Sequence, residues 1–328
     1  MKRLILLSLL FLIPSSVLAV EISVGTTNLS IPSPVGYSLI TSDMQPYVKL
    51  TERFVPPMNE QFAKFLPEAD AAIAARGEIP QSHRHFSVQT AKALIQPFIS
   101  NNDFAQFKRK IKTQNEDIFK KAELQMPDWL EKINKGIAMD YNVDLGISID
   151  RPLPLPSHSE TERSLAYSTF VKYKINDEEG KPSFFEGIVT ATLVHVQGKV
   201  LFLYVNAEKS GLDWCRTESS KWADAVIAAN PSTGDIAARE SKHSQGDFDW
   251  EKIFVKGTLG AIMGGILGII GYFSKRRNVP GKEQKKGKID GKSSDRKEER
   301  LCVCGNCEYL ISKNSDGFCP ECGHRLEE

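Results

Sequence analysis

The chain has 328 residues and a formal net charge of +1, with 25% charged and 9% aromatic residues. This composition excludes a wholly disordered chain and gives no sign of a protein that binds nucleic acid over its whole surface. The length allows one large hydrophobic core or two smaller ones in front of the C-terminal segments.

Residues 1–19 have the pattern of a secretory signal peptide. Lys2 and Arg3 precede an apolar stretch at 4–13, and small residues follow up to Ala19. We predict cleavage after Ala19, because this apolar stretch is far shorter than the roughly 20 residues that cross a bilayer. An uncleaved membrane anchor is the alternative.

Residues 20–231 are predicted to form an extracytoplasmic α+β domain. Short strands at 21–24 and 37–41 open the domain, and mostly helical periodicity follows them. A helix that begins at Asn102 or Asp103, either of which can cap it, places four apolar side chains on one face: Phe104, Phe107, Ile111 and Ile118. The other face carries Lys108, Arg109, Lys110 and Lys112. A solvated helix surface is the more ordinary interpretation of these four cations, and a basic groove is the alternative.

The second half of this domain has the period of two that is typical of strands. Candidate strands are 138–149, 165–175, 187–196 and 199–206. Gln197-Gly198 is predicted to make a tight hairpin turn, and a helix at 213–229 is predicted to pack Trp222 onto the sheet. An antiparallel meander with segregated helices is an α+β fold. This order of elements is loosely similar to the Mog1/PsbP-like fold.

The predicted outer domain contains a single cysteine and four histidines that could carry chemistry. Cys215 is interpreted as a small buried core residue, with an interchain disulfide as the alternative. On a strand, His83 and His85 would face the same way and could share a metal, but a polar surface loop is the preferred interpretation. His158 lies near two glutamates in a proline-rich loop, and His195 is expected to be a hydrogen-bonded core residue. The sequence predicts no catalytic residue and no cofactor-binding residue, since it contains no nucleophile elbow, P-loop or dinucleotide fingerprint.

A transmembrane helix is predicted at residues 253–273, after a polar juxtamembrane linker at 232–252. The uncharged run 257–273 reaches membrane thickness when 253–255 are added and Lys256 extends to the interface. Three cations, Lys275, Arg276 and Arg277, follow directly and are expected to stay in the cytoplasm, with Trp250 as an interfacial anchor on the other side. A glycine-rich buried helix is the alternative.

Glycines recur every fourth residue in this run, at Gly260, Gly264 and Gly268. Such a strip lets a second helix approach closely, so it predicts a homodimer. The alternative is that glycine is simply common in membrane helices.

Residues 274–300 are predicted to be a basic cytoplasmic linker. Between Lys275 and Arg300 the chain has 11 Lys or Arg and 5 Asp or Glu. We expect attraction to anionic lipid headgroups, although a role as stop-transfer signal and spacer is sufficient. The interspersed acids argue against an RNA-binding arm.

Residues 301–328 are predicted to hold a structural zinc ion. Two C-x-x-C pairs, separated by 11 residues, supply the four thiolates of a tetrahedral site: Cys304, Cys307, Cys319 and Cys322. Cys302 and His324 are spare donors that could replace one of the four, and iron bound as in rubredoxin is an alternative.

The sequence Cys319-Pro320-Glu321-Cys322-Gly323 resembles the second knuckle of the zinc-ribbon family, and the resemblance covers about 302–326. The first knuckle departs from the family pattern because Glu308 stands where a glycine is usual, and the loop between the knuckles is short. The resemblance implies a metal-stapled module, whose partners can be proteins or nucleic acids.

Together these features predict a bacterial inner-membrane protein with one membrane span, acting as an adaptor or sensor. Zinc thiolates suit the reducing cytosol, which agrees with the orientation given by the cations after the span. The expected partners are membrane lipid, a protein that contacts the ribbon, and a second copy of the chain. An envelope-associated hydrolase with a purely structural ribbon is the alternative. A nucleic-acid-binding tail is disfavoured by its acidic residues: Glu308, Glu321, Glu327 and Glu328.

Overall fold

The computed structural model describes residues 19–141, 146–150, 152–176, 181–234, 236–238, 250, 253, 255, 301–303 and 310–312. Contacts divide the chain into two units, 1–279 and 280–328, which are described separately below. The predicted signal segment 1–18, the glycines of the predicted membrane run and the basic linker 274–300 lie outside the described residues.

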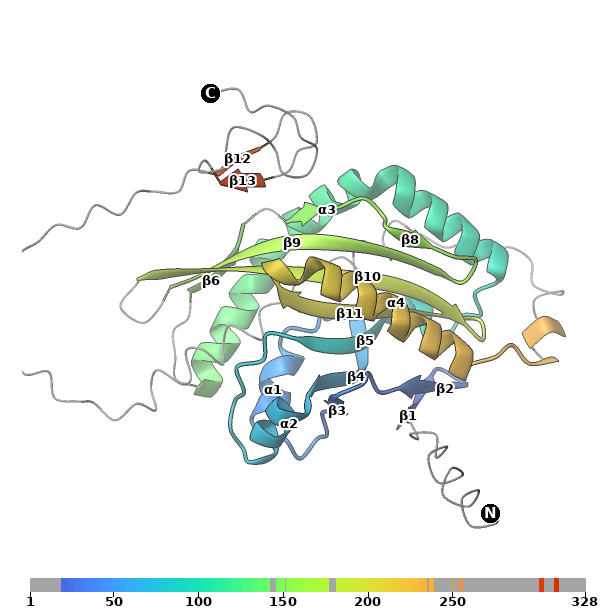
Figure 1. Ribbon diagram of the computed structural model, residues 1–328, viewed down its shortest axis with the longest axis horizontal. Coiled ribbons are helices and arrows are strands. Elements are labelled where there is room, and N and C mark those ends of the chain that lie inside the picture. The colour runs from blue at the N-terminus through green and yellow to red at the C-terminus, as the bar shows by residue number, and fades with distance from the viewer. Residues whose placement is uncertain are drawn as a thin grey trace, which may run out of the picture. The chain divides into compact units, whose positions relative to one another are not determined.

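A mostly antiparallel sheet forms the centre of the first unit (Figure 1). Its main path runs in the order β3 (Tyr37–Leu39), β4 (Asn59–Pro67), β5 (His85–Ala91), β11 (Lys199–Glu208), β10 (Pro182–Val196), β9 (Ser164–Asn176) and β6 (Gly146–Ile149). Two short strands, β7 (Leu153–Pro154) and β8 (Ser159–Glu160), also pair with β9. A separate hairpin consists of β1 (Ala19–Val24) and β2 (Thr27–Pro32). The predicted α+β class is confirmed.

Helices cover both faces of this sheet. The long helix α3 (Asn101–Tyr141) lies on one face, and α4 (Leu212–Ala229) lies on the other face together with the β1–β2 hairpin (Figure 1). Two short helices, α1 (Tyr47–Glu52) and α2 (Glu68–Ala75), pack beside β4. Two 3-10 turns, η2 (Lys92–Leu94) and η3 (Lys209–Gly211), complete the described helical elements. Each face of the sheet therefore buries its own apolar cluster.

The cap of helix α3 lies two or three residues before the predicted cap at Asn102 or Asp103. The Ser100 hydroxyl accepts a hydrogen bond from the Asp103 backbone N–H at 3.1 Å. In return, the Asp103 carboxylate accepts one from the Ser100 N–H, also at 3.1 Å. This reciprocal pair is a capping box, so Ser100 is the cap. The predicted apolar face is confirmed, since Phe104, Phe107, Ile111 and Ile118 are all buried.

The strand predicted at 138–149 is wrong over its first half. Helix α3 continues past Pro127 to Tyr141, and β6 begins only at Gly146. The helix persists because its apolar face continues with the same spacing through Met126, Leu130, Ile133 and Ile137, all buried against the sheet.

The predicted turn at Gln197-Gly198 is confirmed. Gln197 has a φ of 49° and Gly198 a φ of 74°, as a two-residue type I′ hairpin turn requires. A Cβ on Gly198 would also lie 2.2 Å from the Phe98 ring. The turn and the packing of Phe98 therefore both demand glycine, and Val196 pairs with Lys199 across the hairpin.

Among the described residues, no helix is long and apolar enough to cross a bilayer. Of the predicted span 253–273, only Ile253 and Val255 are described. Both belong to the core cluster of α3, with 5% and 4% of their surface exposed.

The role of interfacial anchor that the sequence suggested for Trp250 is wrong. Its ring stacks on Phe107 of α3 at a centroid distance of 4.7 Å, and only 3% of the residue is exposed. The end of the predicted linker is thus part of the domain core, because burial against α3 removes more apolar surface from water than an interfacial position does.

Candidate functional site

Five polar residues lie buried on the α3 face of the sheet and form what we call the buried polar cluster. Four come from strands β4, β5 and β11, and the fifth comes from α1: Lys64, His85, Ser87, Asn206 and Tyr47. Lys64 pairs with Ser87, and His85 pairs with Asn206. Side chains of directly opposite residues start about 5 Å apart, so the four strand residues are neighbours on one surface.

The alternation of the strands places these residues on the same face as the α3 core. Ser87 pairs with Tyr204, and both Tyr204 and Phe202 pack in the cluster that contains α3. Asn206 follows Tyr204 by two residues and therefore points to the same side. Tyr47, the first residue of α1, brings its ring to 5.8 Å from the Lys64 ammonium.

The residues of the buried polar cluster are almost completely removed from solvent. The exposed fraction is 4% for Lys64, 1% for Asn206 and 0% for Tyr47. Neither the Tyr47 hydroxyl nor the two amide atoms of Asn206 have a hydrogen-bond partner in the structure. A buried polar group without a partner costs about 1–3 kcal/mol, so these three atoms call for an explanation.

Electrostatics also distinguish this cluster from the rest of the core. Burial lowers the pKa of Lys64 to about 7, and no counter-charge among the residues that the structure describes offsets this effect. Burial raises the pKa of the Tyr47 phenol, and the charge of Asp70 raises it further. The phenol therefore stays protonated at neutral pH, where it can donate a hydrogen bond.

Two other buried lysines are fully engaged by protein groups. The Lys199 ammonium donates to the carbonyl oxygens of Ile95, Gln96 and Pro97 at 2.8, 3.2 and 3.0 Å. It thereby holds the segment after η2 against the β10–β11 turn. These three hydrogen bonds give Lys199 a structural role. Lys64 differs from Lys199 because burial alone shifts its pKa.

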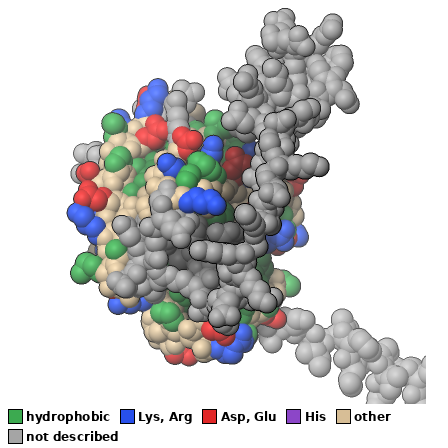
Figure 2. All heavy atoms as spheres, turned by 90° about the vertical axis from the view of Figure 1, so that its left-hand side faces the viewer, with side chains coloured by type: hydrophobic (Ala, Val, Ile, Leu, Met, Phe, Trp, Pro, Cys, Tyr) green, Lys and Arg blue, Asp and Glu red, His purple; other side chains and the backbone are tan. Residues whose placement is uncertain are grey.

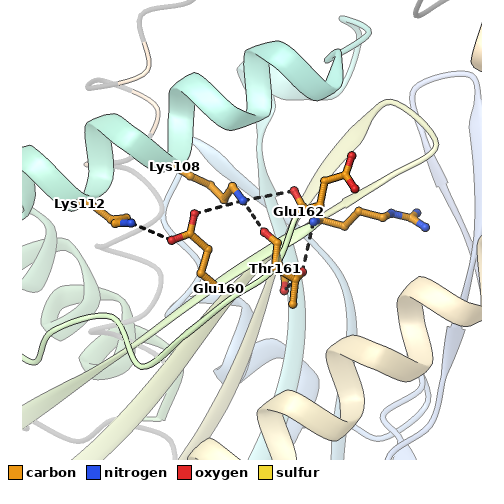
Figure 3. A network of polar contacts seen from close by, with 7 residues as sticks. Lys108, Lys112, Glu160, Thr161 and Glu162 are labelled. Carbon is orange, nitrogen blue, oxygen red and sulfur yellow. Dashed lines mark hydrogen bonds and ion pairs between the residues drawn. The ribbon is translucent and has the colours of Figure 1, made fainter.

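The third buried lysine, Lys108, belongs to a network between α3 and the β8 segment (Figure 3). Its ammonium donates to the carbonyl oxygens of Thr161 and Glu162 and lies 3.3 Å from the Glu160 carboxylate. Lys112 binds the same carboxylate at 2.8 Å, and together these contacts keep the pKa of Glu160 low. The interpretation of this basic face as fully solvated is therefore wrong for Lys108, which is 7% exposed.

The face drawn in Figure 2 carries basic and acidic side chains interspersed among its coloured residues. Such mixing agrees with the formal charge of +1 and differs from the single-sign surface of a nucleic-acid binder.

The structure separates the two neighbouring histidines of the sequence. His83 is on the surface, where its Nδ1 lies 3.0 Å from the Glu208 carboxylate and half of its side chain is exposed. His85 is 2% exposed on β5, so the surface-loop interpretation holds for His83 and is wrong for His85. Among the described residues, no group of three or more His, Cys, Asp or Glu is placed to hold a metal ion.

His158 and His195 lie in different surroundings. Burial, and to a lesser extent the positive charge of nearby Arg216, lowers the pKa of His158 to about 4. Its neighbour in sequence, Glu160, is engaged by the lysines of α3 instead. His195 is confirmed as a hydrogen-bonded core residue, because its Nε2 lies 2.8 Å from the Ile99 carbonyl and its ring stacks on Phe104.

Cys215 is confirmed as a core residue. It is fully buried on the α4 face beside Trp222 and Val226, and burial raises the pKa of its thiol to about 12. A thiol of this kind is unreactive at neutral pH.

The predicted zinc ligands Cys304, Cys307, Cys319 and Cys322, with the spare donor His324, lie outside the described residues. In the second unit, β12 (Leu301–Val303) pairs in antiparallel register with β13 (Leu310–Ser312). The connection between these strands carries Cys304 and Cys307. Cys302 belongs to β12, where its backbone pairs with Ile311.

Sequence reasoning did not find the buried polar cluster. In β5 the polar residues His85, Ser87 and Gln89 alternate with apolar ones, a pattern that ordinarily means one solvated face. The helices α1 and α3 cover that face, and only the fold shows it. The sequence offered one signal, which was this alternation together with Lys64. This lysine interrupts the otherwise apolar C-terminal part of β4.

No family model matches the chain, and no curated protein matches its sequence. The function is therefore inferred below from the residues and their arrangement.

Proposed function

We propose that the chain is a single-pass adaptor or sensor of the bacterial inner membrane. In this proposal residues 20–231 bind a ligand outside the cytoplasm, the uncharged run 257–273 crosses the membrane, and residues 301–328 form a cytosolic zinc ribbon that contacts a protein. The predicted span is shortened at its start because Ile253 and Val255 are buried in the domain core. The cations Lys275, Arg276 and Arg277 after the apolar run support the orientation.

The observation that carries the binding role is the buried polar cluster. A domain that only had to fold would gain stability from apolar residues in place of Lys64, whose charged form is penalised by burial, and of Asn206, whose amide atoms have no hydrogen-bond partner among the described residues. Proteins retain such unfavourable groups at functional sites. The cluster is therefore the part of the domain best suited to hold a ligand.

The packing of Trp250 supports a connection between this domain and the membrane. Trp250, Ile253 and Val255 share one core cluster with Leu50 of α1, the helix that contributes Tyr47 to the buried polar cluster. The uncharged run begins at Gly257, two residues after Val255. In this proposal a change in the position of α1 reaches Val255, just before the apolar run, through packed side chains.

The hairpin of β12 and β13 supports the proposed ribbon. In zinc ribbons a C-x-x-C pair stands at the end of a two-stranded hairpin, and the connection between β12 and β13 carries such a pair. Anionic lipid near the basic linker and a second copy packed through Gly260, Gly264 and Gly268 complete the proposed partners.

The alternative function is an envelope-associated hydrolase. It would need one of the histidines in a site with carboxylates, and the closest approach to this is the exposed pair of His83 and Glu208. His158 instead faces Arg216, and the ring of His195 is engaged in the core. The binding role is better supported because its residues are gathered in one place.

Affinity capture of the full chain in detergent tests the adaptor role. We expect the wild type to carry about one zinc ion per chain and the Cys319→Ser/Cys322→Ser variant to carry almost none, because two thiolates do not hold a structural zinc ion. Protein partners of the ribbon should disappear from the variant alone. The control variant Cys302→Ser should keep both the zinc and the partners. Recovery of the same proteins by the double variant would contradict the adaptor role.

A further inference from the structure

We infer that the buried polar cluster binds a small oxyanion, a carboxylate or phosphate group, held by Lys64 together with Tyr47, Ser87 and Asn206. This inference rests on the proposed binding role of the outer domain and names the chemistry of its ligand.

The first argument is the balance of donors and acceptors. The Lys64 ammonium, the Tyr47 hydroxyl and the Asn206 amide offer hydrogen-bond donors, and the Tyr47 and Asn206 groups have no partner. The Ser87 hydroxyl, 3% exposed, lies on the strand between Lys64 and Asn206. An ionised carboxylate or phosphate offers only acceptors, so it complements the ammonium, the hydroxyl groups and the amide NH2 of this set; the Asn206 Oδ1 acceptor is not satisfied by it.

The second argument is charge. The protonated form of Lys64 is penalised by burial alone, and its ammonium faces the ring of Tyr47 and no carboxylate. The buried lysines Lys199 and Lys108 show how this protein satisfies such a group, with carbonyl oxygens and a glutamate. At Lys64 the described residues supply no such carboxylate. A bound anion would supply both the acceptors and the counter-charge.

The third argument is position. Ser87 in β5 pairs with Lys64 in β4 and with Tyr204 in β11. Because Asn206 is two residues beyond Tyr204 on β11, it is a diagonal neighbour of Ser87. Diagonal neighbours on a sheet are about 7–8 Å apart. Lys64 and Asn206 lie two strand spacings apart, about 10 Å across the sheet, so the long lysine side chain has to reach toward the amide for one anion to contact both. Apolar residues surround these donors, among them Leu66 beside Tyr47. Exclusion of water by such neighbours strengthens the attraction between an ammonium and an anion.

Calorimetric titration of the full chain in a nonionic detergent tests the inference. The probes are acetate and inorganic phosphate, with acetamide as a neutral analogue of acetate. We expect saturable binding of at least one of the two anions and no binding of acetamide. We expect Lys64→Met to weaken binding at least 10-fold, and Tyr47→Phe and Asn206→Leu to weaken it several-fold, because each removes a donor. The matched control Lys108→Met removes another buried lysine and should bind as the wild type does.

Proton uptake gives a second readout. An anion that binds to neutral Lys64 draws a proton onto the amine, so at pH 8 binding should take up close to one proton per chain. The uptake is measured by comparing the heat of binding in two buffers with different ionisation enthalpies. At pH 5.5, where Lys64 is already charged, the uptake should be close to zero.

Three results would overturn the inference: no binding of either anion, equal binding by the wild type and Lys64→Met, or equal binding of acetate and acetamide. Asn206→Leu keeps the test decisive even if Lys64→Met does not fold. Failure here would leave the adaptor role untouched, since zinc content and partner capture report on the other end of the chain.

Discussion

The Lys64→Met variant is expected to be more stable than the wild type at neutral pH, by about 4 kcal/mol. Burial lowers the pKa of Lys64 from its ordinary 10.5 to about 7, so between these two values the unfolded chain holds a proton that the folded chain lacks. Stability of the wild type therefore rises with pH across this window, by about 1.4 kcal/mol for each pH unit. Below pH 7 both states are protonated and the full penalty for burying the charge remains.

Chemical denaturation of both proteins from pH 6 to pH 10 measures this effect. The advantage of Lys64→Met should fall from about 4 kcal/mol at pH 7 to about 1 kcal/mol at pH 10. Taking the difference between the proteins cancels the titration of the buried phenols of Tyr47, Tyr173 and Tyr204, which burial also shifts. Lys199→Met is the contrasting variant and should be less stable than the wild type, because it leaves three carbonyl oxygens without their donor. A Lys64→Met variant that is destabilised at every pH would refute the account of this cluster.

The Trp250→Ala variant is expected to lose about 3–5 kcal/mol of stability, the usual cost of removing a buried tryptophan. Trp250 is 3% exposed and stacks on Phe107, so its loss would leave a cavity between α3 and the segment that leads to the apolar run. A tryptophan in a solvated linker, by contrast, can be replaced with a change of less than about 0.5 kcal/mol.

Denaturation followed by far-ultraviolet circular dichroism distinguishes these cases. Phe184→Ala is the control, because this aromatic side chain is 58% exposed and should cost little. The double variant with Phe107→Ala should lose less than the sum of the two single losses, since the rings share one contact. Full additivity, or a cost for Trp250→Ala as small as for Phe184→Ala, would show that the segment at 250–255 is not part of the core.

The sequence predicted those elements whose apolar spacing is regular. Helix α4, strand β11 and the turn at Gln197-Gly198 lie where the periodicity and turn chemistry placed them. Cys215 could be assigned to the core because it shares a helix face with Trp222 and Val226, and His195 because it lies in an apolar strand; the structure confirms both. In these segments local preference and tertiary packing agree.

The central strands β4 and β5 were missed for a physical reason. The sequence region that contains them was interpreted as mostly helical, and β5 alternates His85, Ser87 and Gln89 with apolar residues although all seven of its residues are buried. Burial of its polar face depends on α1 and α3, which come from other parts of the chain. No local pattern could report that cover, and so the candidate site could not be predicted from the sequence.

Trp250 is a second residue whose long-range contact could not be predicted from the local sequence. Its acidic neighbours and the apolar run that follows are typical of a membrane interface, which led to its interpretation as an anchor. The stacking of its ring on Phe107, more than 140 residues earlier in the chain, is a long-range contact that outweighs this local signal.

Protease treatment of intact spheroplasts tests the central claim most directly, that the two ends of the chain lie on opposite sides of the membrane. The full chain would carry one epitope tag directly after Ala19 and another after Glu328. External protease should remove the first tag and spare the second, and both should be lost once the membrane is permeabilised. Survival of the first tag in intact spheroplasts, or loss of the second, would contradict the account.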